Sequence, residues 1–141
     1  MVRRRVVVTG QGVVTPIGLH LTDFWNSLLE GKSGIGPVTV FDTANIPTKI
    51  GAQVTGFDPL EYMSKKEAQK VAQFTQFALA AARQAVEQSR LVIDERNAGR
   101  VGVIVGSGAG GLDVIEENYR KLTELGPKRV SPYFVSSMMI N

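Results

Sequence analysis

Apolar and polar positions recur along this chain with two different periods. Two short segments, Arg5–Thr9 with three valines at its centre and Val101–Val105 with no polar side chain, are typical of strands that a parallel sheet buries on both faces. Elsewhere apolar residues recur every three or four positions, which predicts helices. The longest such stretch carries Val71, Phe74, Ala78, Ala81 and Ala85, and a second predicted helix, from about Leu112 to Leu125, carries Leu112, Ile115, Tyr119 and Leu122 on one side.

Capping residues mark where the predicted helices begin and end. Ser64 and Glu67 have the spacing of a capping box, in which each side chain satisfies a backbone amide of the other, and we expect one long helix to follow. Thr22 is predicted to cap a helix over Asp23–Glu30, which Gly31 ends. Its packed face is expected to hold Phe24, Trp25, Leu28 and Leu29. Gly126 and Pro127 end the last helix.

The order of these elements predicts an α/β layer fold. Residues from about 32 to 63 are rich in Gly, Pro, Thr and Asp, which indicates an irregular excursion with one edge strand at Ile50–Val54. Only two core strands are predicted, so a parallel sheet would be incomplete. Residues 132–141 are still apolar where the chain stops, so we expect a truncated chain that exposes apolar surface and is poorly soluble.

The composition excludes several kinds of chemistry. The chain has no cysteine and one histidine, His20, which excludes disulfides, thiolate metal sites and a cysteine nucleophile, and leaves no histidine cluster to bind a metal. No apolar span is long enough for a membrane helix, and the start of the chain lacks a secretory signal core. We therefore expect a cytoplasmic protein without a metal centre.

A glycine-rich segment, Gly106–Gly111, follows the second apolar run and precedes a helix, so it offers backbone amides and open space to a ligand. Gly106, Gly108 and Gly111 match the spacing of a dinucleotide-binding turn. About 20 residues further on, however, the chain has neither the second strand nor the ribose-binding acid that such a turn requires. Nucleotide binding is therefore disfavoured, and the glycines need another explanation.

Other polar residues have simpler interpretations. Arg3–Arg5 is interpreted as a solvated lead into the first strand rather than a nucleic-acid arm, because no aromatic residues or recognition helix accompany it. His20 is expected at the start of a helix rather than in catalysis. Asp113, Glu116 and Glu117 are expected on a solvated helix face. Thr9, Thr15 and Ser107 have no basic partner that would activate them as nucleophiles.

Several collinear motifs together resemble one family. They are the segments 6–18, Phe24-Trp25, 29–35, Phe41-Asp42, Gly102–Gly111, Ile115–Asn118 and 126–134. In this order they resemble the opening of the β-ketoacyl-ACP synthases, the elongating condensing enzymes of fatty acid synthesis. The segment 41–63 and the capping box at Ser64 are more similar to type II than to type I enzymes.

The resemblance implies a thiolase-like α/β fold, in which two similar halves stack as layered helices and sheets and the protein forms a homodimer. Residues 1–141 would be most of the first half. Enzymes of this family condense an acyl-enzyme with malonyl-ACP by decarboxylative Claisen chemistry, using a cysteine and two histidines. All three would lie beyond the position of Asn141, so no catalytic residue is expected in this chain. The resemblance implies no cofactor.

The resemblance also assigns two sets of candidate site residues. The acyl pocket would include Gly108, Ala109, Gly110, Tyr133 and Phe134, with Tyr133 and Phe134 reaching the pocket across the dimer. Ala109 holds the position that gates the acyl chain, and its small side chain would admit longer chains. The docking surface for acidic acyl carrier protein would include Lys65, Lys66, Lys70, Lys128 and Arg129. The positive charges at 65, 66 and 70 oppose the dipole of the expected long helix, which suggests a role other than helix stability.

Two alternatives remain open for the sites and one for the whole chain. Tyr133 and Phe134 are equally compatible with ordinary core aromatics, and the lysines with a solvated face. The chain itself is either the N-terminal part of an acyltransferase or a self-standing, non-catalytic ketosynthase-like or small α/β binding domain.

Overall fold

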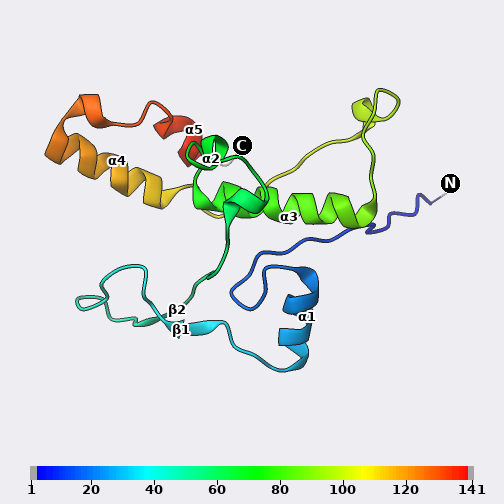
Figure 1. Ribbon diagram of the computed structural model, residues 1–141, viewed down its shortest axis with the longest axis horizontal. Coiled ribbons are helices and arrows are strands. Elements are labelled where there is room, and N and C mark those ends of the chain that lie inside the picture. Colours follow the sequence, from blue (N-terminus) through cyan, green and yellow to red (C-terminus); the bar gives the residue numbers. More distant parts are fainter. Residues whose placement is uncertain (1–2, 140–141) are drawn as a thin grey trace. The chain divides into compact units, whose positions relative to one another are not determined.

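The computed structural model describes residues 3–139 and divides into two compact units. The first contains residues 3–58 and 80–91, and the second contains residues 59–79 and 92–139. The helix α3 (Gln73–Ser89) contributes its first turns to the second unit and the rest to the first. Figure 1 labels the α-helices and β-strands, numbered in chain order.

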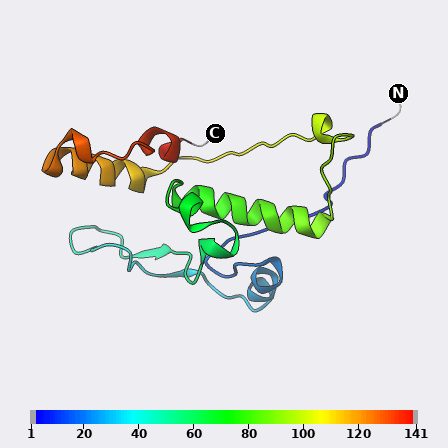
Figure 2. The ribbon, with the colours of Figure 1, turned by 45° about the horizontal axis from the view of Figure 1, so that its top comes forward.

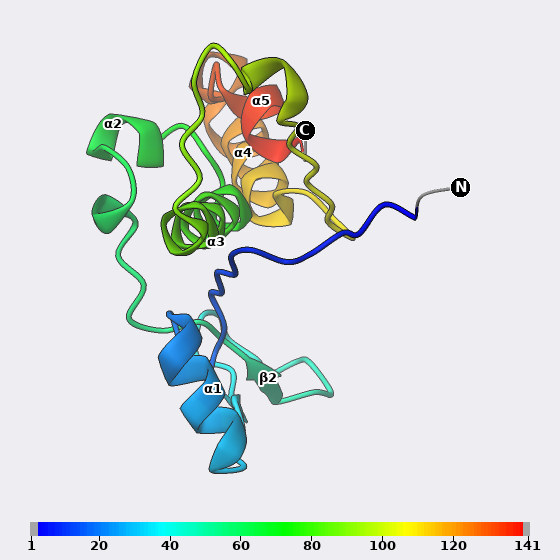
Figure 3. The same cartoon turned by 90° about the vertical axis from the view of Figure 1, so that its right-hand side faces the viewer.

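The first unit contains the helix α1 (Leu21–Leu29) and a small antiparallel ribbon of β1 (Ile35–Pro37) and β2 (Ile50–Ala52). Figure 3 shows α1 and the strand β2. Ile35 pairs with Ala52 and Pro37 pairs with Ile50. The strand β2 lies within the predicted edge strand, whereas its partner β1 was not predicted.

The N-terminal segment of this unit lies against the second half of α3. A Cβ added at Gly10 or Gly12 would collide with the carbonyl oxygen of Ala85 or Ala81. Two glutamines of α3 hold the segment. The amide of Gln11 donates to Gln88 Oε1 at 2.7 Å, and that of Val13 donates to Gln84 Oε1 at 3.1 Å. The alanine-rich face of α3 thus permits a close approach, as predicted, but of a glycine-containing loop.

The two predicted core strands are not formed among residues 3–139. Arg5–Thr9 and Val101–Val105 are extended segments without a sheet partner in this part of the chain, and the side chains of Val6 and Ile104 are 92% and 100% exposed. An apolar strand of a parallel sheet needs neighbours on its edges and covering elements on its faces. The described residues supply neither, so the prediction of strands at these two positions is wrong.

The helix α1 differs from its prediction at its start and in its buried side. It begins at Leu21 after His20, which makes no side-chain cap, so Thr22 is not the N-cap. Gly31 has a φ of +67° just after the helix, which agrees with the predicted end. The buried residue is Ser27, whose hydroxyl donates to Ile17 O at 2.7 Å, while Trp25 and Leu29 are mostly exposed.

The second unit is helical. It contains η1 (Pro59–Glu61), α2 (Lys65–Ala68), the start of α3, η2 (Ala98–Arg100), α4 (Leu112–Leu125), η3 (Pro127–Arg129) and α5 (Phe134–Met138). Figure 2 shows α5 and η3 close to α4, which both of them contact. The helix α4 has its predicted bounds, and Gly126 ends it with a φ of +87°.

The capping box is confirmed, and a long helix carrying Phe74, Ala78, Ala81 and Ala85 does follow, but the prediction that it runs on from Ser64 without a break is wrong. The amide of Ser64 donates to Glu67 Oε2 at 2.9 Å and the amide of Glu67 donates to Ser64 Oγ at 3.3 Å. The helix then stops at Ala68, and α3 begins only at Gln73. Side chains from elsewhere satisfy carbonyls at this break: Gln76 donates to Ala68 O at 3.0 Å, and Ser137 donates to Lys70 O at 2.7 Å.

Buried apolar side chains are few. Among the described residues, only Ala72 and Ala80 are buried hydrophobic residues, and both are small. None of the helices in residues 3–139 combines the length and apolar character needed to cross a membrane.

Candidate functional site

The glycine-rich segment is open along most of its length and tightly packed at its end. A Cβ added at Gly106 or Gly108 would have no atom within 4 Å, and Ala109 is exposed. The Ser107 hydroxyl donates to Ala109 O at 2.6 Å, which closes a local turn. Gly111, by contrast, is buried, and its Cβ would lie 3.1 Å from Ala72 Cβ and 3.3 Å from Ser137 O.

The two candidate aromatics lie next to one another but in different surroundings. Phe134 is half-buried and lines an apolar cavity of about 170 Å³ together with Ile115, Tyr119, Leu122, Val130 and Asn118. Tyr133 immediately precedes α5 and is 44% exposed. Phe134 therefore packs on α4, whereas Tyr133 presents much of its ring to the surface.

The candidate docking residues include four exposed cations that form no ion pair within the described residues, 3–139. Lys65 and Lys66 lie on α2, and Lys128 and Arg129 lie on η3. None of the four forms an ion pair with another residue of the described part, 3–139. Because α2 is a single turn, it has little dipole to oppose, and the argument from a long helix dipole is wrong.

Cations on α4 are arranged differently. Arg120 forms ion pairs with Glu117 at 2.8 Å and Glu124 at 3.2 Å, and Lys121 lies 3.2 Å from Glu117. Hydrogen bonds from Arg120 and Lys121 hold the pKa of Glu117 below its ordinary value. Within the part of the chain that the structure describes, the cations of α4 are therefore paired with nearby carboxylates, whereas Lys65 and Lys66 of α2 and Lys128 and Arg129 of η3 are not.

Lys70 belongs to the predicted docking set and contacts the predicted pocket set. Its Nζ lies 5.0 Å from the centroid of the Tyr133 ring, a cation–π geometry. Its carbonyl oxygen accepts the bond from Ser137, and one residue further along α5, Met138 O accepts from the amide of Gly111 at 3.3 Å. The structure thus links Lys70 to the end of the glycine-rich segment through α5. Within the described residues, no hydrogen bond joins Gly108, Ala109 or Gly110 to Tyr133 or Phe134.

Two buried polar residues of this site were not predicted from the sequence. Ser137 is 8% exposed and Asn118 is 5% exposed. Asn118 Oδ1 accepts from the amide of Ser131 at 2.8 Å, which holds the segment before Tyr133 against α4. The sequence did contain a signal for each, namely a polar residue inside an apolar pattern. Asn118 lies between Ile115 and Leu122, and Ser137 lies within the apolar residues 132–141.

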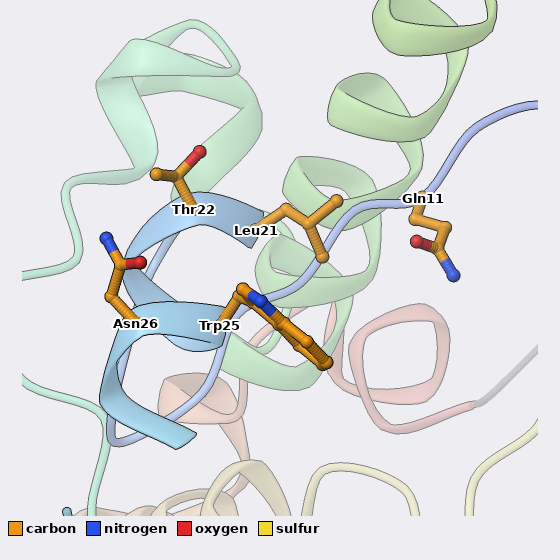
Figure 4. Close-up of a pocket in the computed structure, with 5 residues that line it drawn as sticks. All are labelled: Gln11, Leu21, Thr22, Trp25 and Asn26. Carbon is orange, nitrogen blue, oxygen red and sulfur yellow. The ribbon is translucent and has the colours of Figure 1, made fainter. Parts of the chain in front are cut away.

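A separate cavity of about 410 Å³ lies in the first unit. Figure 4 shows its lining residues, Leu21, Thr22, Trp25 and Asn26 from α1 and Gln11 from the N-terminal segment. These side chains supply apolar, hydroxyl and amide groups but no acid or base. None of them was a predicted site residue.

Two solved structures that share the fold of this chain contain ketosynthases. The chain matches the ishigamide ketosynthase/chain length factor with a TM-score of 0.79 and 28% identity, over 97% of this chain and 34% of that one. It also matches a chain of a complex between a type II PKS acyl-carrier protein and its ketosynthase, bound to the hexaketide, with a TM-score of 0.77 and 26% identity, over 97% of this chain and 35% of that one. The fold is therefore that of the ketosynthases, which confirms the predicted thiolase-like α/β class.

The chain belongs to the β-ketoacyl synthase family, because the sequence model of the family's N-terminal domain matches residues 3–141. Its relatives include the 3-oxoacyl-[acyl-carrier-protein] synthase 2 of Coxiella burnetii, to which it is 50% identical over its whole length. The chain spans 34% of that relative. The resemblance seen in the sequence motifs is thereby confirmed.

Proposed function

We propose that this chain is the N-terminal part of a cytoplasmic 3-oxoacyl-[acyl-carrier-protein] synthase, which condenses an acyl-enzyme with malonyl-ACP in fatty acid elongation. The observation that carries the proposal is the match to a synthase of this type at 50% identity over all 141 residues. A chain without cysteine and with one histidine would supply binding surfaces to the reaction rather than the Cys-His-His centre.

Acyl carrier protein, loaded with acyl or malonyl groups, is the proposed partner. Its docking surface would consist of Lys65, Lys66, Lys70, Lys128 and Arg129. Unneutralised surface cations steer an acidic partner and select it against neutral ones, so the missing ion pairs at residues 65, 66, 128 and 129 within the described part support this role. One matched ketosynthase is itself bound to an acyl-carrier protein.

The acyl chain would lie along Gly108, Ala109 and Gly110, with Tyr133 and Phe134 completing the pocket in a homodimer. Open space beside Gly108 and the exposure of Ala109 support a passage at this segment. A small side chain at position 109 would favour longer acyl chains. The exposed ring of Tyr133 is better suited to a pocket shared with a second subunit than the half-buried ring of Phe134.

Binding of acyl carrier protein to the full chain tests the docking surface. The double variant Lys65→Gln/Lys66→Gln should bind the acyl carrier protein of Coxiella burnetii about three- to tenfold more weakly, because exposed charge pairs each contribute modestly. The matched control, Arg83→Gln/Arg96→Gln, also removes two positive charges, but from residues already paired with Glu87 at 2.9 Å and Asp94 at 2.6 Å. Equal losses in both double variants would contradict a specific docking surface.

The intact mass of the native protein separates the two proposals for the whole chain. A synthase similar to the relative should weigh about three times the 15.3 kDa of this chain, since the chain spans 34% of that relative. A native mass of 15.3 kDa would instead favour a self-standing, non-catalytic carrier-binding protein.

A further inference from the structure

The short helix α5 touches both proposed binding regions of the second unit. At one side Ser137 Oγ donates to Lys70 O at 2.7 Å, and the Tyr133 ring lies under Lys70 Nζ at 5.0 Å. At the other side Met138 O accepts from the amide of Gly111 at 3.3 Å. A single turn of helix therefore connects the lysine-bearing break between α2 and α3 with the end of the glycine-rich segment.

These contacts meet where the chain has little freedom to adjust. The Lys70 carbonyl lies in the break, where no backbone amide of the described residues donates to it, and Ser137 donates to it from a position that is 8% exposed. Gly111 lies between Ala72 Cβ and Ser137 O, where a Cβ would fit only if these neighbours moved by a few tenths of an ångström. Closely packed groups transmit displacements rather than absorb them, so a shift of the break must move α5 and Gly111 together.

Space for such a shift lies beside the contact. A cavity of about 240 Å³ is lined by Gln69 and Val71 of the break, by Ser137 of α5, and by Val114 and Asn118 of α4, among others. Residues 106–108 do not line this cavity, and a Cβ added at Gly106 or Gly108 would have no atom within 4 Å. Open space beside these glycines leaves room for the segment to change conformation when Gly111 moves.

We propose that Ser137 is a positioning residue that couples docking of the carrier protein at Lys65–Lys70 to the conformation of the glycine-rich segment 106–111. Docking would attract the Lys70 side chain to the carrier protein and displace the break between α2 and α3. This displacement would change the conformation of the segment that receives the acyl chain. Because coupling between two sites is reciprocal, a chain whose segment 106–111 is held in the docked conformation would bind the carrier protein more tightly. This inference rests on the proposed function of the two regions.

Hydrogen exchange of the amides of residues 106–111 in the full chain tests the coupling, with the holo-acyl carrier protein of Coxiella burnetii as the probe. Saturating carrier should change the exchange rate at Gly111 by about fivefold or more, the lower range of coupling between sites. Ser137→Ala should abolish this response, and Ser137→Thr, which keeps the hydroxyl, should retain it.

A second pair of variants changes Tyr133, which contacts Lys70 and is 44% exposed, so that shortening its side chain removes little packing. Tyr133→Leu removes the ring under Lys70 and should weaken the response, whereas Tyr133→Phe keeps the ring and should preserve it. If Ser137 and Tyr133 only stabilised the fold, their variants would exchange faster both with and without carrier, and the response to the carrier would stay intact. The ratio of the exchange rate with carrier to the rate without carrier therefore separates coupling from stability.

The outcomes distinguish this inference from the proposed function. Carrier that binds the wild-type chain without altering exchange at residues 106–111 overturns the coupling and leaves the docking surface in place. The same response in Ser137→Ala and Tyr133→Leu as in the wild type also overturns it. Failure of the carrier to bind the wild-type chain overturns both proposals together.

Discussion

At the scale of single residues, the glycines of the segment 106–111 are not equivalent. Gly111 has a φ of −62°, which any residue can adopt, so a larger side chain there meets only a steric obstacle. The added methyl group of Gly111→Ala would lie 3.1 Å from Ala72 Cβ and 3.2 Å from Val114 Cγ2. We expect the free energy of unfolding in urea to fall by about 1–3 kcal/mol, as overpacked sites do.

The control for this substitution lies three residues away in the same segment. Gly108→Ala places its methyl group in open space, so the free energy of unfolding should change by less than about 0.5 kcal/mol. Similar losses at both positions would show that backbone freedom, and not the close contacts at Gly111, sets the cost.

At the scale of elements, the start of α2 depends on the ionisation of Glu67. Hydrogen bonds from the side chain and the backbone of Ser64 hold the pKa of Glu67 below its ordinary value. A lowered folded-state pKa means that the carboxylate stabilises the folded state at a pH above the ordinary pKa of glutamate. This contribution is lost as the pH falls through the lowered value.

Glu67→Gln tests this pH dependence. In the wild type, part of the protection of the α2 amides against hydrogen exchange should be lost in acid, as Glu67 is protonated. Because glutamine does not titrate, this acid-dependent part of the protection should be absent in Glu67→Gln. Asp113→Asn is a suitable control, because Asp113 lies in the first turn of α4 rather than at a capping box. An unchanged acid dependence in Glu67→Gln would assign the effect to another carboxylate.

Elements whose signals are local were predicted best from the sequence. The capping box at Ser64 involves residues three positions apart, and α4 combines an uninterrupted apolar period with a glycine and a proline at its end. The break after Ala68 was missed because one of the side chains that satisfy its carbonyls lies far along the chain. Ser137 is 67 positions from Lys70, and no local period reveals such a partner.

The predicted strands and the candidate site show the same limit. Arg5–Thr9 and Val101–Val105 have the composition of buried strands, but a strand depends on neighbours that its own sequence cannot supply. The candidate site residues came from a resemblance to a family, which identified the lysines and the glycine-rich segment. Ser137, which bonds the Lys70 carbonyl, and Asn118, which bonds the amide of Ser131, became visible only from the hydrogen bonds.

At the scale of the whole molecule, exposed apolar segments dominate the expected behaviour of the isolated chain. Val6 and Val8 in the first unit are 92% and 78% exposed, and Val103 and Ile104 in the second are 86% and 100% exposed. Runs of exposed apolar side chains in extended backbone promote association between chains. The expected poor solubility therefore has a structural cause in both units.

Ile104→Thr tests this explanation, because it removes apolar surface from a side chain that packs against nothing in the described residues. We expect less self-association in light scattering over a range of concentrations, with the free energy of unfolding unchanged within about 0.5 kcal/mol. Ile17→Thr makes the same chemical change at a half-buried position beside Gly34, so it should lower the stability without improving solubility. If Ile104→Thr left the association unchanged while Ile17→Thr increased it, partial unfolding rather than the exposed segment 101–105 would be the source of aggregation.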